Sequence, residues 1–341
     1  MNTMRAAVLV KEKKFELREV PVPTIKENQV LVKIEATAIC GTEVSMFTGE
    51  HTKGYPLIMG HETAGVVHKA GSAVSSVKEG DPVFIISGIS CGFCEYCREG
   101  KENLCPYGGL LGREMQGSYA EYLAVPEHAV FKLPLDFPPV HATTLNLLMT
   151  VIHSHRKIRV YPGYSVVVLG LGPAGLAQLH FSKISGAGPL IGVGHREWRG
   201  RLAEDFGADK VVITKEEDPL KKIKNALGAD GADLVITASS QPQAFKQAVE
   251  IAKPGATVLQ FGIMGRAGEV DLYSIYFKEL AILGSRATVG ADFPLAVRWF
   301  LNHQELLKKI VTRTLPLEDI QEGFEMILNK EEELLRVVIT Y

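Results

Sequence analysis

The sequence predicts an α/β protein of two domains, one a small β-barrel and the other a doubly wound parallel sheet. Three observations support this fold class. The chain has 341 residues, whereas single hydrophobic cores rarely grow beyond about 300 residues. The pattern of apolar residues changes near residue 150, from short strands between turns to strands and helices in alternation. A glycine-rich turn joins the first strand and the first helix of the second part.

The first part of the chain is predicted to be β-rich. Short runs of β-branched and aromatic residues lie between glycines and prolines, a pattern typical of a small barrel or curled sheet. The predicted strands cover residues 5–10, 30–39, 65–68, 82–86 and 119–125.

The second part alternates between strands and helices. Its strands are apolar throughout rather than half polar, which favours a parallel sheet covered on both faces. Strands are predicted at residues 165–169, 190–193, 210–213, 233–237 and 257–260, and helices at 174–184, 197–206 and 242–251. A helix at 294–301 and a strand at 337–340 then return to the first domain. The predicted domains are therefore 1–149 completed by 288–341, and 150–287.

Composition excludes some classes of function. The chain is 46% hydrophobic and 22% charged, with a formal net charge of −2, which argues against a general binder of nucleic acid or of anionic membranes. No apolar stretch is long enough to span a bilayer and the first ten residues lack a secretory signal, so we expect a cytoplasmic protein. Five cysteines in such a chain indicate metal binding or catalysis before disulfides.

Residues 166–175 contain a G-x-G-x-x-G turn between a buried strand and a helix. Gly170 permits the tight turn, Gly172 lets a pyrophosphate approach the backbone, and Gly175 lets the helix pack on the strand. Pro173 and Ala174 begin the helix, whose free N–H groups and partial positive charge favour phosphate. An incidental glycine turn is the alternative, but the strand–turn–helix context predicts dinucleotide binding.

The end of the second strand predicts which dinucleotide is bound. NAD-binding proteins place an acid here for the ribose 2′-hydroxyl, but this sequence has Gly194. Arg196, assisted by His195 or Arg199, would instead bind the 2′-phosphate of NADP(H). The alternative is that these side chains are solvated and that Glu197 serves NAD(H). The candidate cofactor-binding residues of this domain are Gly170, Gly172, Pro173, Ala174, Gly175, Gly194, His195, Arg196, Arg199 and Gly262.

Four cysteines lie within fifteen residues, in the predicted loop 88–108, at Cys91, Cys94, Cys97 and Cys105. Four thiolates on a short turn-rich loop suit tetrahedral Zn²⁺ and leave no position for substrate, which predicts a structural site. An iron–sulfur cluster is the main rival, although the last spacing is too long for the bacterial ferredoxin pattern.

A second donor set is separated along the chain. Cys40 follows the strand that ends at Ile39, and His61 and Glu62 follow twenty residues later. A thiolate, an imidazole and a carboxylate are donors that a catalytic zinc uses. Taken singly, each residue also fits an ordinary role as a small buried side chain, a core histidine or a solvated acid.

Together these motifs make the chain similar to the zinc-dependent medium-chain alcohol dehydrogenase family over essentially its whole length. The resemblance rests on the order and spacing of Cys40-Gly41-Thr42, Gly60-His61-Glu62-x-x-Gly65, the four cysteines, the glycine turn and Arg336. It implies a GroES-like β-barrel catalytic domain with an inserted Rossmann domain, an active site in the cleft between them, and hydride transfer between an alcohol and NAD(P). It also implies a homo-oligomer, either a dimer or a tetramer.

The resemblance assigns roles to several residues. Cys40 and His61 would bind a catalytic Zn²⁺, and Glu62 would be a ligand that exchanges with water or substrate. Thr42 would take the hydroxyl proton and pass it on through the cofactor ribose. Arg336 would lie near the cofactor pyrophosphate.

Three positions depart from the family pattern. Ser45 replaces the relay histidine, and Glu43 replaces the aspartate that supports the site. Asn146 stands where the third zinc ligand is normally Cys, Asp or Glu, and it is expected to be a weak ligand or a substrate contact. The predicted substrate is an alcohol, polyol or hydroxy-amino acid, or the matching carbonyl. Alternatives are a zinc-independent carbonyl or enoyl reductase, and a non-catalytic nicotinamide-binding protein with only the structural zinc.

Overall fold

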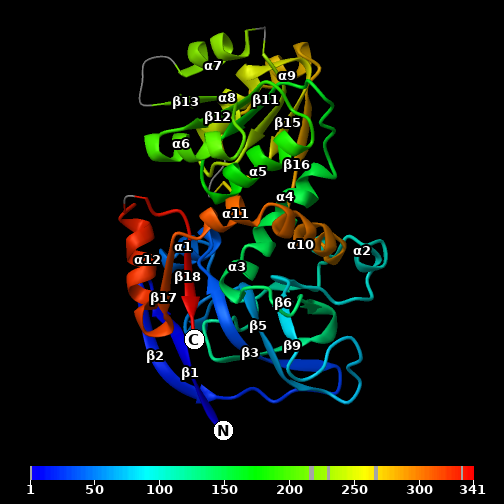
Figure 1. Ribbon diagram of the computed structural model, residues 1–341, viewed down its shortest axis with the longest axis vertical. Coiled ribbons are helices and arrows are strands. Elements are labelled where there is room, and N and C mark those ends of the chain that lie inside the picture. The colour runs from blue at the N-terminus through cyan, green and yellow to red at the C-terminus, as the bar shows by residue number, and fades with distance from the viewer. Residues whose placement is uncertain (1, 215–218, 229–230, 265–267, 332) are drawn as a thin grey trace. The chain divides into compact units, whose positions relative to one another are not determined.

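The computed structural model describes residues 2–214, 219–228, 231–264, 268–331 and 333–341 (Figure 1). The chain divides into two compact units. Unit 1 comprises Met1–Asn146 and Thr288–Tyr341, and unit 2 comprises Leu147–Ala287. The sequence placed the first boundary at 149/150, a few residues later along the same helix, and the second at 287/288.

The largest sheet of unit 1 contains segments from both parts of that unit. Its strands are β3 (Gln29–Ala38), β5 (Glu62–Ala70), β6 (Pro82–Ile85), β9 (Tyr122–Pro126), β10 (Val130–Lys132), β17 (Arg313–Pro316) and β18 (Val337–Thr340). They are arranged β10-β6-β5-β3-β18-β17, with β9 also paired to β3. Neighbouring strands are antiparallel except β17 and β18. The red strand β18 therefore lies beside the blue strand β3 in Figure 1.

Shorter elements complete unit 1. Its remaining strands are β1 (Thr3–Lys11), β2 (Lys14–Pro21) and β4 (Leu57–Ile58), which form one sheet, and β7 (Gly88–Ile89) and β8 (Gly109–Leu110), which form another. Its helices are α1 (Gly41–Phe47), α2 (Glu95–Arg98), α3 (Pro139–Ala142), α10 (Phe293–Asn302), α11 (Gln304–Leu307) and α12 (Ile320–Leu328). Single 3₁₀ turns cover Glu102–Leu104, Glu127–Ala129, Gly290–Asp292, Lys308–Ile310 and Leu317–Asp319.

An aromatic cluster fixes α1 in unit 1. Phe47, at the end of α1, is fully buried, and its ring centroid lies 4.8 Å from that of Phe324 in α12. Tyr119 is also fully buried and meets Phe324 edge to face at 6.1 Å. Aromatic pairs of this kind add about 0.5–1.5 kcal/mol beyond the burial of their area. The start of α1, where Cys40 lies, is thereby held by the core.

Unit 2 is a parallel α/β sheet. Its strands are β11 (Val166–Leu169), β12 (Leu190–Gly194), β13 (Lys210–Ile213), β14 (Ala232–Thr237), β15 (Ala252–Gln260) and β16 (Ala281–Gly284). Its helices are α5 (Pro173–Ile184), α6 (Glu197–Asp205), α7 (Pro219–Leu227), α8 (Pro242–Ile251) and α9 (Leu272–Phe277), with α4 (Leu145–His155) beginning in unit 1.

The strand order of unit 2 identifies its topology. The order β13-β12-β11-β14-β15-β16, with every pair parallel, is the 3-2-1-4-5-6 order of a Rossmann fold. The direction of winding reverses between β11 and β14, which is where such sheets bind ligands beyond the carboxyl ends of the strands. The predicted mixed fold class, with a doubly wound sheet, is confirmed.

The core of unit 2 follows from its sequence pattern. All four residues of β11 are buried, as expected for a central parallel strand. Helix α8 presents Phe245, Ala248 and Val249 to the same cluster as Val167 and Val235. Its bounds match the predicted helix 242–251. Within the described residues, none of the helices has the length and apolar character required to span a bilayer.

Candidate active site

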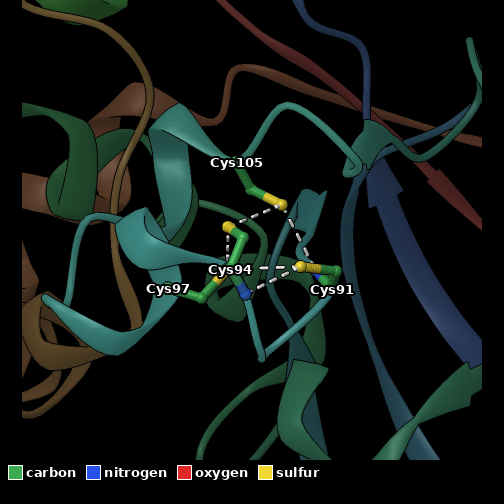
Figure 2. A group of neighbouring side chains, drawn as sticks. All are labelled: Cys91, Cys94, Cys97 and Cys105. Carbon is green, nitrogen blue, oxygen red and sulfur yellow. Dashed lines mark hydrogen bonds between the residues drawn. The ribbon is translucent and has the colours of Figure 1, made fainter.

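The four cysteines of the loop between β7 and β8 converge on one point. All carry free thiols, and their sulfur atoms lie within 4.8 Å of one another. The Sγ–Sγ distances are 3.5 Å for Cys94 and Cys97, and 3.9 Å for both Cys91–Cys97 and Cys94–Cys105. Four sulfurs about 2.3 Å from a central Zn²⁺ have edges of about 3.8 Å. Figure 2 shows the sulfur atoms turned toward one another, so the loop is preformed for a closed tetrahedral site.

The backbone of this loop prepares a thiolate. The N–H of Cys94 lies 3.4 Å from the Cys91 sulfur. Removal from solvent raises the pKa of Cys91, but the backbone donors of Phe93 and Cys94 outweigh that effect and lower it to about 6. At Cys94 a backbone hydrogen bond also lowers the pKa, but burial and the neighbouring thiols outweigh it and raise the pKa to about 12. Zn²⁺ binds thiolates rather than thiols, so the backbone favours the metal-binding form at Cys91.

A second donor set lies at the end of β3 and the start of β5. These strands are antiparallel, with Ala38 opposite Glu62. Cys40, two residues after β3, therefore lies near the start of β5, where His61 and Glu62 are. Donor atoms of Cys40, His61 and Glu62 lie within 4.8 Å of one another. His61 and Glu62 are buried and Cys40 is half-buried. The fold thus brings Cys40 together with His61 and Glu62, although twenty residues lie between Cys40 and His61 in the sequence.

Glu43 supports His61 from the first turn of α1. Its Oε1 lies 3.0 Å from His61 Nδ1, and its Oε2 accepts the N–H of Cys40 at 2.9 Å and the hydroxyl of Tyr119 at 2.8 Å. Cys40 is the N-cap of α1, and its backbone N–H donates to the Glu43 side chain three residues later. This is one of the two hydrogen bonds that make up a capping box. Glu43 therefore reaches the imidazole despite being one methylene longer than the family's aspartate.

Charge in this network fixes the protonation of its members. Burial, followed by the Glu43 carboxylate, raises the pKa of Tyr119 well above its usual range, so its hydroxyl keeps its proton and donates. Burial lowers the pKa of His61, but the charges of Glu43 and Cys40 outweigh it and raise the pKa well above the ordinary value. Glu43 and Cys40 therefore favour a positive charge at His61.

Glu62 has two fixed partners. Its Oε2 accepts from Nη2 of Arg336, which lies just before β18, and its Oε1 accepts from Nδ2 of Asn146 at 3.1 Å. Arg336 also donates to the backbone carbonyl of Thr143 at 3.3 Å. The guanidinium, predicted to lie near a pyrophosphate, has the Glu62 carboxylate as its ionic partner.

These residues fit a zinc ion by the chemistry of the donor set. A thiolate and a carboxylate neutralise Zn²⁺, and an imidazole is a third donor of the type that catalytic zinc uses. The Oδ1 atom of Asn146 is buried and lacks a hydrogen-bond partner among the described residues. Thr42 Oγ1 lies 3.8 Å from Cys40 Sγ, which places a hydroxyl beside the donor set.

The glycine turn after β11 has the geometry that a dinucleotide requires. Gly170 has φ +109°, and a Cβ there would lie 2.7 Å from the carbonyl oxygen of Ala238. A Cβ on Gly175 would lie 1.8 Å from the carbonyl oxygen of Gly170. At Gly172, the N-cap of α5, a Cβ would meet nothing within 4 Å. Packing thus demands glycine at the first and last positions, whereas the middle position leaves open space beside the helix start.

The residues predicted to read the cofactor lie between β12 and α6. Arg196 is the N-cap of α6, and Arg199 lies one turn further with its guanidinium 5.1 Å from the Trp198 ring centroid. His195 is exposed, and Arg196 and Arg199 are half-buried. Burial, together with the positive charge of Arg196, lowers the pKa of Arg199 to about 10. Arg196 and Arg199 therefore lie close enough for their positive charges to interact.

Gly194 and Gly262 have a packing explanation. A Cβ on Gly194 would lie 2.8 Å from the side chain of Leu171, and one on Gly262 would lie 2.2 Å from the carbonyl oxygen of Ser239. Both residues are therefore required by their surroundings, whether or not a cofactor is bound.

Sequence reasoning missed part of the site. Tyr119 was predicted only as the start of a strand, and Asn146 was not linked to Glu62. No local pattern contains these contacts, because the paired residues are 76 and 84 positions apart. The visible signal was the pair of departures from the family pattern, Glu43 and Asn146.

Comparison with known proteins agrees with this geometry. Residues 26–135 match the alcohol dehydrogenase GroES-like domain, and residues 173–302 match the zinc-binding dehydrogenase domain. L-threonine 3-dehydrogenase of Bacillus velezensis is 32% identical over 335 residues, which cover 96% of each chain.

Solved structures share the whole fold. A Sinorhizobium meliloti 1021 protein with NADP bound is 28% identical, covers 100% of both chains and has a TM-score of 0.90. The short chain alcohol dehydrogenase of Escherichia coli CFT073, complexed with NADH, is 26% identical, covers 100% of both chains and has a TM-score of 0.92. The chain therefore belongs to the zinc-dependent medium-chain alcohol dehydrogenase family, and it is an oxidoreductase of the CH–OH group.

Proposed function

We propose that this enzyme is an NADP(H)-dependent zinc dehydrogenase that interconverts an alcohol and its carbonyl compound. The observation that carries the proposal is the convergence of Cys40, His61 and Glu62 within 4.8 Å. A closed four-cysteine site in the same unit supplies a structural zinc site, so that the two donor sets have separate roles.

The chain's own residues perform defined tasks in this reaction. Cys40, His61 and Glu62 would hold Zn²⁺, which when bound acts as a Lewis acid toward the substrate oxygen. Glu43 orients His61 through its Nδ1, as partners of metal-bound histidines generally do. Thr42, whose hydroxyl lies 3.8 Å from Cys40 Sγ, would accept the proton of the substrate hydroxyl as it passes its own proton to the cofactor ribose during oxidation, with the reverse transfer during reduction.

Unit 2 would bind the nicotinamide cofactor, which supplies or accepts the hydride. The N–H groups at the start of α5 face the open space at Gly172 and suit a pyrophosphate. Arg196 and Arg199 would bind the 2′-phosphate, whose negative charge would offset the burial and the repulsion from Arg196 that lower the pKa of Arg199. The relative solved with NADP supports this preference, whereas the relative solved with NADH supports NAD(H) as the alternative.

The proposed substrate is a small alcohol, a polyol or a hydroxy-amino acid. The L-threonine 3-dehydrogenase relative, at 32% identity, supports the last class.

We also propose that the enzyme is a homo-oligomer that associates through the edge of the unit 2 sheet. Large apolar side chains of α9 are exposed, with Tyr276 at 76% and Leu272 at 72%. β16, which follows, ends the sheet and exposes 37% of Ile282. Exposed apolar patches beside an open strand edge are typical of interfaces. Sedimentation of wild type and Tyr276→Asp tests this, and a wild-type monomer would contradict it.

The central experiment compares wild type with Cys40→Ala. Wild type is expected to bind two zinc ions per chain and to oxidise NADPH with one member of a carbonyl panel. Cys40→Ala is expected to bind one zinc ion and to lose activity. A wild type with one zinc ion and full reductase activity would favour a zinc-independent reductase instead. A Cys40→Ala variant that keeps both metal and activity would overturn the site.

A further inference from the structure

Asn146 has one defined contact at the candidate zinc site, and that contact is with Glu62. The residue lies in the first turn of α4 and is 5% exposed. Its Nδ2 lies 3.1 Å from Glu62 Oε1. A carboxylate accepts hydrogen bonds but has none to donate. The amide must therefore turn its nitrogen toward Glu62.

The second oxygen of Glu62 is fixed by a different part of the chain. Arg336 donates to Oε2 and is itself tied to the carbonyl oxygen of Thr143. Asn146 and Arg336 thus hold the carboxylate from α4 and from the residue before β18. Rotation of Glu62 away from Cys40 and His61 would break two buried hydrogen bonds, both of them charge-assisted because the acceptor is a carboxylate.

A neutral amide is the appropriate side chain for this task. An aspartate or glutamate at position 146 would bring a second negative charge against the Glu62 carboxylate and would have no proton to donate. Two negative charges at this distance repel one another, and a carboxylate at position 146 would offer Glu62 no hydrogen bond in place of the one that the amide gives. Asn146 donates a hydrogen bond to the ionised form and adds no charge.

We propose that Asn146 is a positioning residue that holds Glu62 as a constant zinc ligand, rather than a ligand itself. The inference rests on the zinc site proposed above. The proposal gives a function to the asparagine that stands at position 146 in place of the family's usual third zinc ligand. Because Asn146 is neutral, Glu62 serves as the negatively charged third ligand. Glu62 then stays on the metal instead of exchanging with water or substrate.

The test is a double-mutant cycle in zinc affinity, measured by chelator competition. Asn146→Leu is expected to weaken binding at the second zinc site by about 10- to 100-fold, as loss of a ligand's hydrogen-bond partner generally does. Glu62→Gln is expected to weaken it at least as much. Adding Asn146→Leu to Glu62→Gln should change little, because Asn146 acts through the carboxylate. Asn146→Ala repeats the test if the leucine variant fails to fold.

Absorption of the Co²⁺-substituted protein provides a readout independent of activity. Asn146→Leu should retain the ligand-field bands of wild type at saturating Co²⁺, because the donor set is unchanged. Thr150→Val, which removes a hydroxyl bonded within α4 to Leu147, is the matched control and should retain wild-type affinity.

The outcomes separate the inference from the proposed function. A wild type that binds only the four-cysteine zinc removes the proposed site, and the inference with it. Two zinc ions with no effect of Asn146→Leu would overturn the inference alone. Additive effects in the cycle, with altered Co²⁺ bands in Asn146→Leu, would show that Asn146 is itself a ligand and would also overturn it.

Discussion

Glu43 Oε1 lies 3.0 Å from Nδ1 of His61, and this contact joins the first turn of α1 to the candidate zinc site. The other oxygen of Glu43 is held by Tyr119 and by the N–H of Cys40. One carboxylate thus fixes a helix start and a metal-binding imidazole together. Removal of the Tyr119 hydroxyl should therefore change the zinc affinity of this site measurably.

Tyr119→Phe is expected to weaken zinc binding at Cys40 and His61 by about 10-fold, because Glu43 loses the hydrogen bond that orients it. Chelator competition measures the affinity. Tyr341→Phe is the matched control, since it removes the hydroxyl of a half-buried tyrosine that is hydrogen-bonded to Thr37 and Ser118 instead of Glu43. Equal losses in both variants would contradict a role for Tyr119 through Glu43.

Arg199→Ala is expected to raise KM for NADPH by about 10- to 100-fold, because a charge-assisted hydrogen bond contributes about 1.5–3 kcal/mol. KM for NADH should stay within about twofold, since NADH lacks the 2′-phosphate. Arg201→Ala, which removes an exposed guanidinium from the same helix, should leave both values unchanged. A wild type that uses NADH as well as NADPH would refute the specificity.

The two metal sites are expected to be separable. Cys94→Ser should lose the zinc of the four-cysteine loop, keep the other zinc and lower the midpoint of thermal unfolding by roughly 5 °C or more. Cys40→Ser should lose the other zinc and keep the loop zinc. Metal analysis and calorimetry measure both effects. Loss of both ions in either variant would show that the sites depend on each other.

His155 is expected to make stability depend on pH. Burial lowers its pKa to about 4, against the opposing hydrogen bond with Gln178 at 2.8 Å. Between pH 4 and 6.5 the unfolded chain therefore binds more protons than the folded one, and stability falls as the pH falls through this range. Above about pH 6.5 His155 is neutral in both states, so its full contribution to the free energy of unfolding is present.

The test compares wild type with His155→Gln by urea unfolding at pH 6.5 and pH 5. Wild type should lose about 1.5 kcal/mol more of its unfolding free energy than the variant over this interval. Protonation of other groups affects both proteins, so the difference isolates His155. Equal losses would mean that His155 is charged in the folded protein.

The fold of unit 2 was predictable because its signals are local. The apolar strand at 166–169, the glycines that follow it and the amphipathic helix at 242–251 each lie within a short window. Strand β2 (Lys14–Pro21) was not predicted, because five of its eight residues are exposed and the alternation of Phe15 and Leu17 with charged residues stops at Arg18 and Glu19. β16 (Ala281–Gly284) was missed for a different reason, since it is only four residues long and lies at the exposed edge of the sheet.

The candidate site was predictable in its donors but not in its supports. Cysteine and histidine are rare enough that Cys40 and His61 stand out at their spacing. Tyr119 and Asn146 do not, because a tyrosine in a strand and an asparagine in a helix have many ordinary uses. Their roles come from contacts across the fold, which the β3–β5 register and the start of α4 create.

The pairing of β18 with β3 has a consequence for how the chain is made. All of unit 2 is synthesised between these two strands, so β3 leaves the ribosome long before its neighbour does. Until β18 arrives, the edge of β3 at Ala36–Ala38 has unpaired backbone groups, and open strand edges invite association with other chains. Arg336, the partner of Glu62, is synthesised just before β18. All of unit 2 is therefore synthesised before the contacts that hold Glu62 at the candidate zinc site can be completed.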